Sequence, residues 1–115
     1  MIKLVIPGRP RPKGRPRFNH KGFVFTPADT RKHEKYVKEI AQKEVDKPLE
    51  GDLVLTVSVF LRNKNHGDLD NYVKLVSDSM NGVAYQDDKQ IKEIHAYLWY
   101  DKENERTEIE VRQIA

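Results

Sequence analysis

Four aspartates in two short segments are the side chains of this sequence best suited to chemistry. Asp68 and Asp70 stand two positions apart, and Asp87 and Asp88 are adjacent in a second predicted loop. Residues i and i+2 of an extended segment point to the same side, about 6.5 to 7 Å apart at Cα, so their carboxylates can converge on one cation. Because Mg²⁺ takes one or two carboxylates together with substrate phosphate, the first pair is typical of a magnesium site. The second pair adds to this site if the fold brings its loop back to the start of the helix predicted at residues 70–81.

The same residues also have ordinary structural interpretations. Asp70 can cap a helix while Asp68 lies in a solvated loop, which is the commonest role of an isolated Asp-x-Asp pattern. Lys74 lies four residues after Asp70, hence on the same helical face, where it can contact a phosphate or merely form a surface ion pair. His66 could transfer a proton or contact phosphate, but a local structural role is the simpler interpretation. The adjacent acids of the second pair are typical of a solvated turn.

A basic segment at residues 9–17 is the second feature with chemical potential. It alternates cations with prolines and glycine and contains no acid. Cations on a proline-stiffened backbone match the phosphates of nucleic acid and predict salt-dependent binding. The Gly-Arg-Pro triplets at residues 8–10 and 14–16 also resemble the cores of minor-groove AT-hooks, and the prolines fit a ligand of a peptide-binding domain. The residues alone leave these three interpretations open.

Composition limits the class of protein. The 115 residues suffice for one domain, spanning residues 1–115. The net charge of +3 is unevenly distributed: residues 1–48 hold 13 of the 21 basic and 5 of the 18 acidic side chains. A basic front half and an acidic back half predict a polyanionic partner and an acidic site. The lack of cysteine excludes disulfides and thiolate zinc sites. The apolar runs are too short for a membrane span or signal peptide, which predicts a cytoplasmic protein.

The hydrophobic pattern predicts an α+β fold. The strand at residues 53–61 is apolar on one face and half apolar on the other, which predicts a central position in a sheet. A turn at residues 101–104 predicts a hairpin between the last two strands. The order of the predicted strands and helices along the chain predicts a two-layer sandwich, with a mixed β-sheet and two helices in a single small domain. The predicted strands are 3–6, 53–61, 91–100 and 107–114, and the predicted helices are 27–45 and 70–81.

Two local patterns concern the region before the first helix. The Thr-Pro-Ala-Asp sequence at residues 26–29 predicts a helix start in which threonine is the cap. A turn at residues 19–22 predicts a small hairpin. We interpret its phenylalanines, Phe18, Phe23 and Phe25, as core or interface side chains rather than base-stacking groups.

Three motifs, taken in order, resemble the RusA family of Holliday junction resolvases. The strongest is Gly-Asp-Leu-Asp-Asn-Tyr-Val-Lys at residues 67–74, which is followed by Ser-Asp at 77–78. The second is Asn-Gly-Val-Ala-Tyr-Gln-Asp-Asp-Lys-Gln-Ile at 81–91, and the third is the opening Pro-Arg-Pro-Lys-Gly-Arg-Pro-Arg at 10–17. Each motif alone is weak, but together they are specific and span nearly the whole chain.

The resemblance implies a homodimeric, Mg²⁺-dependent endonuclease that resolves four-way DNA junctions in recombination and repair, with Mn²⁺ able to substitute. It implies that the catalytic residues are Asp68, Asp70, Asp88 and Lys74. The same three aspartates would be the metal ligands, with Asp87 as the alternative to Asp88. It further implies DNA contacts from the basic segment: Lys13, Arg15 and Arg17, with Arg9 and Arg11.

The resemblance does not assign a role to every residue of the motifs, and it leaves competing functions open. Asp78 belongs to the pattern shared with the family, but no function is indicated for it. The loop at residues 63–66 has no aromatic side chain that could wedge a junction open. A non-catalytic DNA-binding or architectural module that uses the basic segment is the competing interpretation, and an RNA-directed phosphodiesterase is a third. Cleavage of a four-way junction in Mg²⁺ separates them.

Overall fold

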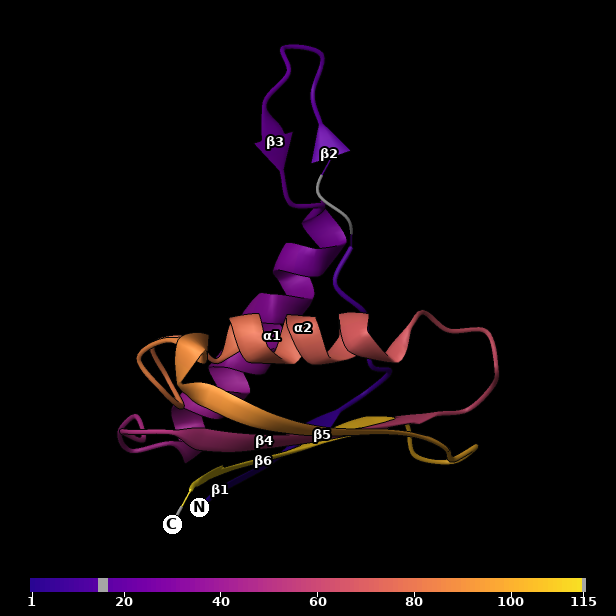
Figure 1. Cartoon of the computed structure of the whole chain (residues 1–115). Coiled ribbons are helices and arrows are strands. Elements are labelled where there is room, and N and C mark those ends of the chain that lie inside the picture. The colour runs from indigo at the N-terminus through magenta and orange to yellow at the C-terminus, as the bar shows by residue number, and fades with distance from the viewer. Residues whose placement is uncertain (15–16, 115) are drawn as a thin grey trace.

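A four-stranded mixed sheet with both helices against one face forms the body of the protein (Figure 1). This computed structural model describes residues 1–14 and 17–114. Sheet order is β1-β6-β4-β5, and the hairpin β2–β3 stands apart from the sheet. The α+β prediction is confirmed. The elements are β1 (Ile2–Pro7), β2 (Arg17–Phe18), β3 (Val24–Phe25), α1 (Ala28–Glu44), β4 (Leu53–Leu61), α2 (Leu69–Ser79), the 3₁₀ turn η1 (Asp88–Gln90), β5 (Ile91–Tyr100) and β6 (Arg106–Gln113).

The central strand is β4, as its apolar pattern predicts. It pairs in parallel with β5 on one side and antiparallel with β6 on the other. Leu55, Val57 and Val59 of β4 are fully buried, in one cluster with Val37 of α1 and Val76 of α2. Burial of this apolar face holds both helices on the sheet. No helix in residues 1–14 and 17–114 is long and apolar enough to cross a membrane.

The last two strands do not form the predicted hairpin, because β4 lies between them. Thr56 of β4 pairs with His95 of β5 on one side and with Glu110 of β6 on the other. Strands on either side of a third lie about 10 Å apart, a distance that the five residues 101–105 between β5 and β6 can span. The most apolar strand, β4, takes the central position, and the largely exposed β5 is left at the edge.

The start of α1 also differs from the prediction. The N-cap residue is Pro27, which has no side-chain acceptor, so the predicted threonine cap is wrong. Thr30 in the first turn is buried, and its Oγ1 accepts a hydrogen bond of 2.9 Å from the Gly14 N–H. A Cβ on Gly14 would meet that oxygen at 2.8 Å, so only glycine permits this approach. The first turn of α1 therefore fixes the basic segment.

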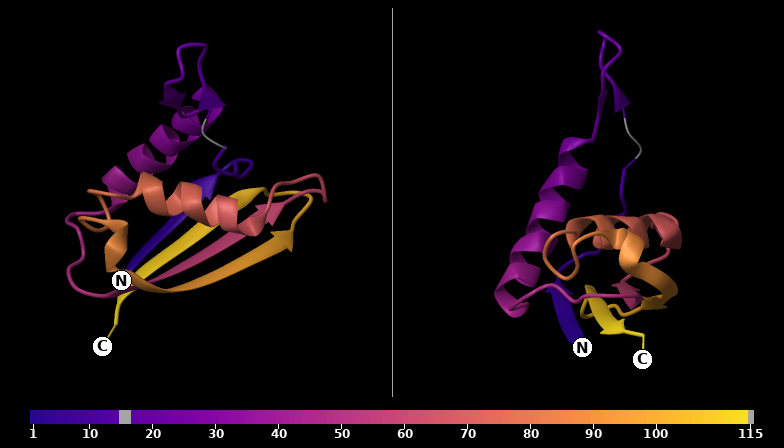
Figure 2. Two further views of the ribbon diagram at one scale, coloured as in Figure 1. Left: turned by 45° about the horizontal axis from the view of Figure 1, so that its top comes forward. Right: turned by 60° about the vertical axis from the view of Figure 1, so that its left-hand side comes forward.

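The predicted small hairpin is present, but its side chains are not in the core. The β2–β3 hairpin projects beyond the N-terminal end of α1 and away from the sheet (Figures 1 and 2). Phe18 and Phe23 are 71% and 67% exposed, and Phe25 is 43% exposed. Assigning these phenylalanines to the core of the domain is therefore wrong. The turn residues predict a hairpin, but they do not show whether the rest of the domain covers it.

We expect Leu55→Ala to lower the free energy of unfolding by about 2 to 5 kcal/mol, because it leaves a cavity in the fully buried centre of the core. Urea denaturation followed by far-ultraviolet circular dichroism measures the change. Val5→Ala, at a strand position that is 55% exposed, is the control and should change stability by less than about 0.5 kcal/mol. Equal effects of the two substitutions would contradict this description of the core.

Candidate functional site

A groove of about 650 Å³ between α2 and β5 is lined by three of the four predicted catalytic residues. Residues from nearly the whole length of α2 line it, so it follows the helix. Much of its wall is apolar, with Leu69 and Val73 from α2 and Ile94 from β5. The polar side chains that line it are Asp70, Lys74, Ser77 and Asp88.

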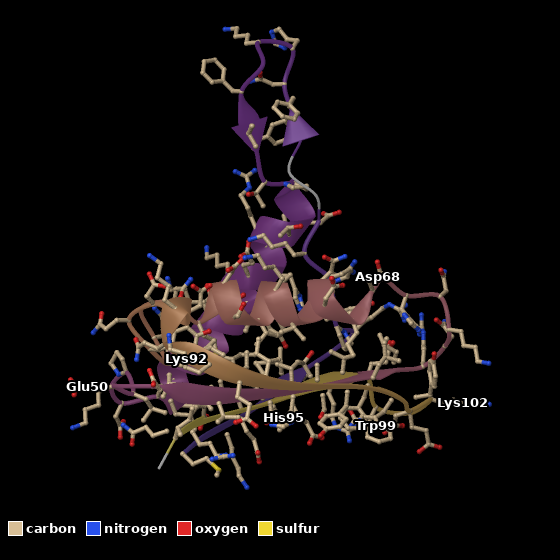
Figure 3. All side chains as sticks on the ribbon, in the orientation of Figure 1. Glu50, Asp68, Lys92, His95, Trp99 and Lys102 are labelled. Atoms are coloured by element: carbon tan, nitrogen blue, oxygen red, sulfur yellow. The ribbon has the colours of Figure 1, made fainter. Side chains whose placement is uncertain are left out.

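The parallel pairing of β4 and β5 determines where these residues lie along the groove. After β4 the chain must return to the other end of the sheet before β5 can begin, and α2 makes that return. Asp68 and Asp70 therefore stand at the start of α2, and Asp88 stands beyond its end. Figure 3 labels Asp68 at one end of α2 and Lys92 toward the other. The condition that the second acidic loop returns to the start of the helix is not met, since this loop lies near the end of α2.

The separation of the acids is larger than one cation can bridge. The Asp88 N–H donates 2.8 Å to Oδ1 of Asn81, and its carboxylate lies near that of Asp78. Asp78 follows Asp70 by eight residues, or about 12 Å along the helix axis. Ligands of one Mg²⁺ lie within about 4 Å of each other, because each is about 2.1 Å from the metal. Among the described residues, no three His, Cys, Asp or Glu side chains are grouped closely enough to hold a metal ion.

The first acidic pair spans the boundary between loop and helix. Asp68 is the N-cap residue of α2 with extended backbone angles, φ −76° and ψ 142°, whereas Asp70 lies in the first helical turn. The extended spacing predicted for the two carboxylates is therefore absent from this described segment. The structural alternative with Asp70 as the cap is also wrong. Within the described part of the chain, the Asp68 side chain makes no capping hydrogen bond, so its carboxylate is available at the positive end of the helix.

The second acidic pair combines a turn residue with a crowded carboxylate. Asp87 caps η1, where its carboxylate accepts from the Lys89 N–H at 2.9 Å, and this hydrogen bond lowers the pKa of Asp87. Burial raises the pKa of Asp88, as do the nearby carboxylates of Asp87 and Asp78. Burial also raises the pKa of Tyr85, with Asp88 and Asp78 adding to the effect. A cation or a protonated donor beside Asp88 would relieve this repulsion.

Asp78 ties the basic segment to α2, a function that its sequence context did not indicate. Its Oδ2 accepts a hydrogen bond of 2.6 Å from Nζ of Lys13, and its Oδ1 lies 3.6 Å from Nζ of Lys74. Glu34 of α1 lies 3.5 Å from the same Lys13 nitrogen. Burial alone would lower the pKa of Lys13, but the hydrogen bond and charge of Asp78 hold it above its usual value. The i,i+4 spacing of Lys74 and Asp78 is the only sequence signal of this cluster.

The basic segment contacts both helices, and two of its cations form ion pairs within the protein. The Lys13 N–H donates to the Asn71 carbonyl of α2 at 2.9 Å. Arg9 pairs with Glu105 at 2.7 Å and donates to the Asn65 carbonyl at 2.6 Å. Arg11 is exposed. Arg15 and the side chain of Arg17, which were also predicted to contact DNA, lie outside the described residues.

His66 has a structural position in the loop that precedes α2. Its Nδ1 lies 2.8 Å from the Gly67 carbonyl oxygen and its Nε2 lies 3.0 Å from the Tyr100 hydroxyl. The ring therefore contacts the loop that precedes α2 through one nitrogen and the last residue of β5 through the other. Gly67 also donates to the Tyr72 hydroxyl at 3.1 Å, so these contacts fix the backbone just before Asp68.

Comparison with known proteins identifies the class. Residues 7–112 match the family described as endodeoxyribonuclease RusA. The chain belongs to this family of DNA nucleases, and the suspected resemblance is confirmed. It is also 28% identical to the uncharacterized protein YqaN of Bacillus subtilis strain 168, in an alignment that covers 99% of this chain and 97% of that protein.

We expect the Lys13–Asp78 contact to couple the basic segment energetically to α2. In a double-mutant cycle of Lys13→Met and Asp78→Asn, the coupling energy should be on the order of 1 kcal/mol, because both side chains are largely buried. Urea denaturation of the four proteins measures it. Lys3 and Glu110, paired at 3.4 Å on the surface, form the control cycle, with an expected coupling of about 0 to 0.5 kcal/mol. Equal couplings in the two cycles would show that the Lys13–Asp78 contact does not anchor the segment.

Proposed function

We propose that the protein is a structure-selective endonuclease that cuts four-way DNA junctions by phosphodiester hydrolysis, in recombination and repair. The observation that carries this proposal is one groove lined by Asp70, Lys74 and Asp88, beside a basic segment anchored to the same helix. Membership of an endodeoxyribonuclease family supports DNA as the substrate. The cytoplasm, where bacterial or phage DNA is accessible, is the compartment that this function requires.

The cations have separate functions in this proposal. Lys74 is 61% exposed and only loosely paired with Asp78, so its ammonium can turn toward a phosphate and stabilise negative charge that develops during hydrolysis. We expect DNA phosphates to be contacted by the exposed Arg11, together with Arg15 and Arg17 of the same segment. Arg9 and Lys13 hold the segment in place through ion pairs and contribute positive potential. Recognition of a branched structure depends on such phosphate contacts more than on base contacts.

The cofactor that we infer is Mg²⁺, with Mn²⁺ as a substitute. Carboxylates are the appropriate ligands, but the residues of one chain do not fit such an ion. Asp68 and Asp70 lie at the start of α2, and Asp88 lies beyond its end. One chain alone therefore does not hold the cation with these three residues.

A second copy of the chain resolves this mismatch. In a two-fold dimer each subunit uses the same surface. If two α2 helices pack antiparallel across the groove, Asp70 of one subunit approaches the partner subunit's Asp88, and the reverse holds at the other site. This packing also buries the apolar wall that Leu69, Val73 and Ile94 expose to the groove. Two sites related by a two-fold axis suit the symmetric cutting of a two-fold junction.

We expect Asp70→Asn to abolish cleavage of a four-way junction in Mg²⁺ while junction affinity changes by less than about threefold, since the change removes one negative charge from the groove and no cation. Denaturing gels measure cleavage and mobility shifts measure binding. Asp46→Asn, an exposed residue after α1, is the charge-matched control and should cut normally. Normal cutting by Asp70→Asn would refute the site assignment. Binding without cleavage by the unmodified protein in Mg²⁺ and Mn²⁺ would favour the non-catalytic module.

Mixed dimers test whether the site is shared between subunits. We expect Asp70→Asn and Asp88→Asn chains to be inactive separately but to nick one strand of the junction after co-refolding, because one of the two sites then carries neither change. Mixing Asp70→Asn with Asp68→Asn is the control, since both changes lie in the same segment and every site stays defective. Recovery in neither mixture would contradict the shared site.

A further inference from the structure

We propose that the β2–β3 hairpin, residues 17–25, is an arm that binds unpaired nucleotides at the branch point of DNA by stacking its phenylalanines on exposed bases. The class of ligand rests on the proposed function, and this role replaces the core or interface role that the sequence predicted for Phe18, Phe23 and Phe25, which are exposed. The arm itself is outside the groove and has no part in the acidic site. Its construction, charge and exposed rings each support the inference.

Apolar side chains occupy both faces of the arm. Phe18 pairs directly with Val24 across the two strands, and Phe25 pairs with Arg17. Because successive strand residues point to opposite faces, Phe25 lies on the face opposite to Val24. All three apolar side chains are exposed, with Val24 at 60%. A two-stranded hairpin is only marginally stable in water by itself, so this exposed apolar surface indicates an external partner.

The tip of the arm is held by a dense set of local hydrogen bonds. Oδ1 of Asn19 accepts from the N–H groups of Lys21 and Phe23 at 2.9 and 3.0 Å. The Asn19 N–H donates to the Phe23 carbonyl at 2.9 Å, and Gly22 has a φ of +83° that favours glycine. The tip therefore presents Phe23 on a fixed turn, which lowers the conformational entropy lost when a ligand binds.

The charge of the arm selects a polyanion over a second copy of the chain. No acidic residue occurs from residue 2 to residue 28, and the arm continues directly from the basic segment. Lys21 and His20 stand at its tip. Two such arms packed on each other about a two-fold axis would bring like charges together, which disfavours self-association through this surface. The cations of the arm would instead attract the phosphates on either side of a base.

Exposed aromatic rings beside cations are the usual means of binding unpaired bases. Each base offers a flat face on which a phenylalanine can stack, and the surrounding cations contact the phosphates. Bases within a continuous duplex are already stacked on each other, whereas bases at a branch point can be displaced. The arm therefore supplies phenylalanine rings, whereas the loop at residues 63–66 contains no Phe, Tyr or Trp.

The test compares variants that keep or remove the aromatic rings. We expect the double change Phe18→Ala with Phe23→Ala to weaken binding of a four-way junction by about tenfold or more, with duplex affinity changed by less than threefold. Phe18→Tyr with Phe23→Tyr should restore binding, because tyrosine keeps the flat ring. Tyr97→Ala with Trp99→Ala, which removes exposed rings from β5, is the matched control and should bind normally. Fluorescence of a junction with 2-aminopurine at the branch point measures binding in EDTA.

Two results would overturn the proposal. One is that the alanine double variant binds the junction and perturbs 2-aminopurine as the unmodified protein does. The other is that sedimentation velocity shows the double variant losing self-association, which would assign the arm to a subunit interface. Because binding is measured in EDTA, absence of cleavage by the unmodified protein would contradict the proposed nuclease function without affecting this comparison. Circular dichroism verifies that each variant is folded.

Discussion

The parallel pairing of β4 with β5 is the constraint on which the arrangement of the site depends. Parallel neighbours need a crossover that returns along the whole strand, and α2 provides it. This crossover creates the groove between α2 and β5 and places one acidic segment at each end of the helix. The same pairing that forms the groove therefore keeps Asp70 and Asp88 of one chain apart. The two-fold dimer that we propose would bring opposite ends of two such helices together, because its α2 helices would run antiparallel.

Charge organises the surface around that groove. Asp78 accepts a hydrogen bond from Lys13 and lies near Lys74 and Asp88. It thus joins the basic segment to the middle of the candidate site. Along the sequence, the basic segment leads directly into the projecting hairpin, which contains Lys21 and no acidic residue. The excess of positive charge in the first 48 residues lies mainly before α1, because residues 2–27 hold seven basic and no acidic side chains, whereas α1 holds five basic and four acidic ones.

The sequence predicted the elements well, because periodicity depends on local burial. The central position of β4, the helices and the tip of the hairpin could all be predicted from apolar spacing and turn residues. Strand order could not, since the pattern of β5 and β6 is compatible with a hairpin whether or not β4 intervenes. The sequence identified the acidic residues of the site, but the distance between Asp70 and Asp88 depends on the crossover helix α2. The Lys13–Asp78 contact joins residues 65 positions apart, and no local pattern predicts it.

The dependence of cation binding on subunit association tests the shared site most directly. Binding of Mn²⁺, followed by electron paramagnetic resonance across protein concentrations, should strengthen as the protein passes from monomer to dimer, because the ligands come from two chains. The ion should in turn stabilise the dimer in sedimentation experiments, and Asp88→Asn should remove both effects. Mn²⁺ binding at these aspartates with an affinity independent of protein concentration would contradict the account.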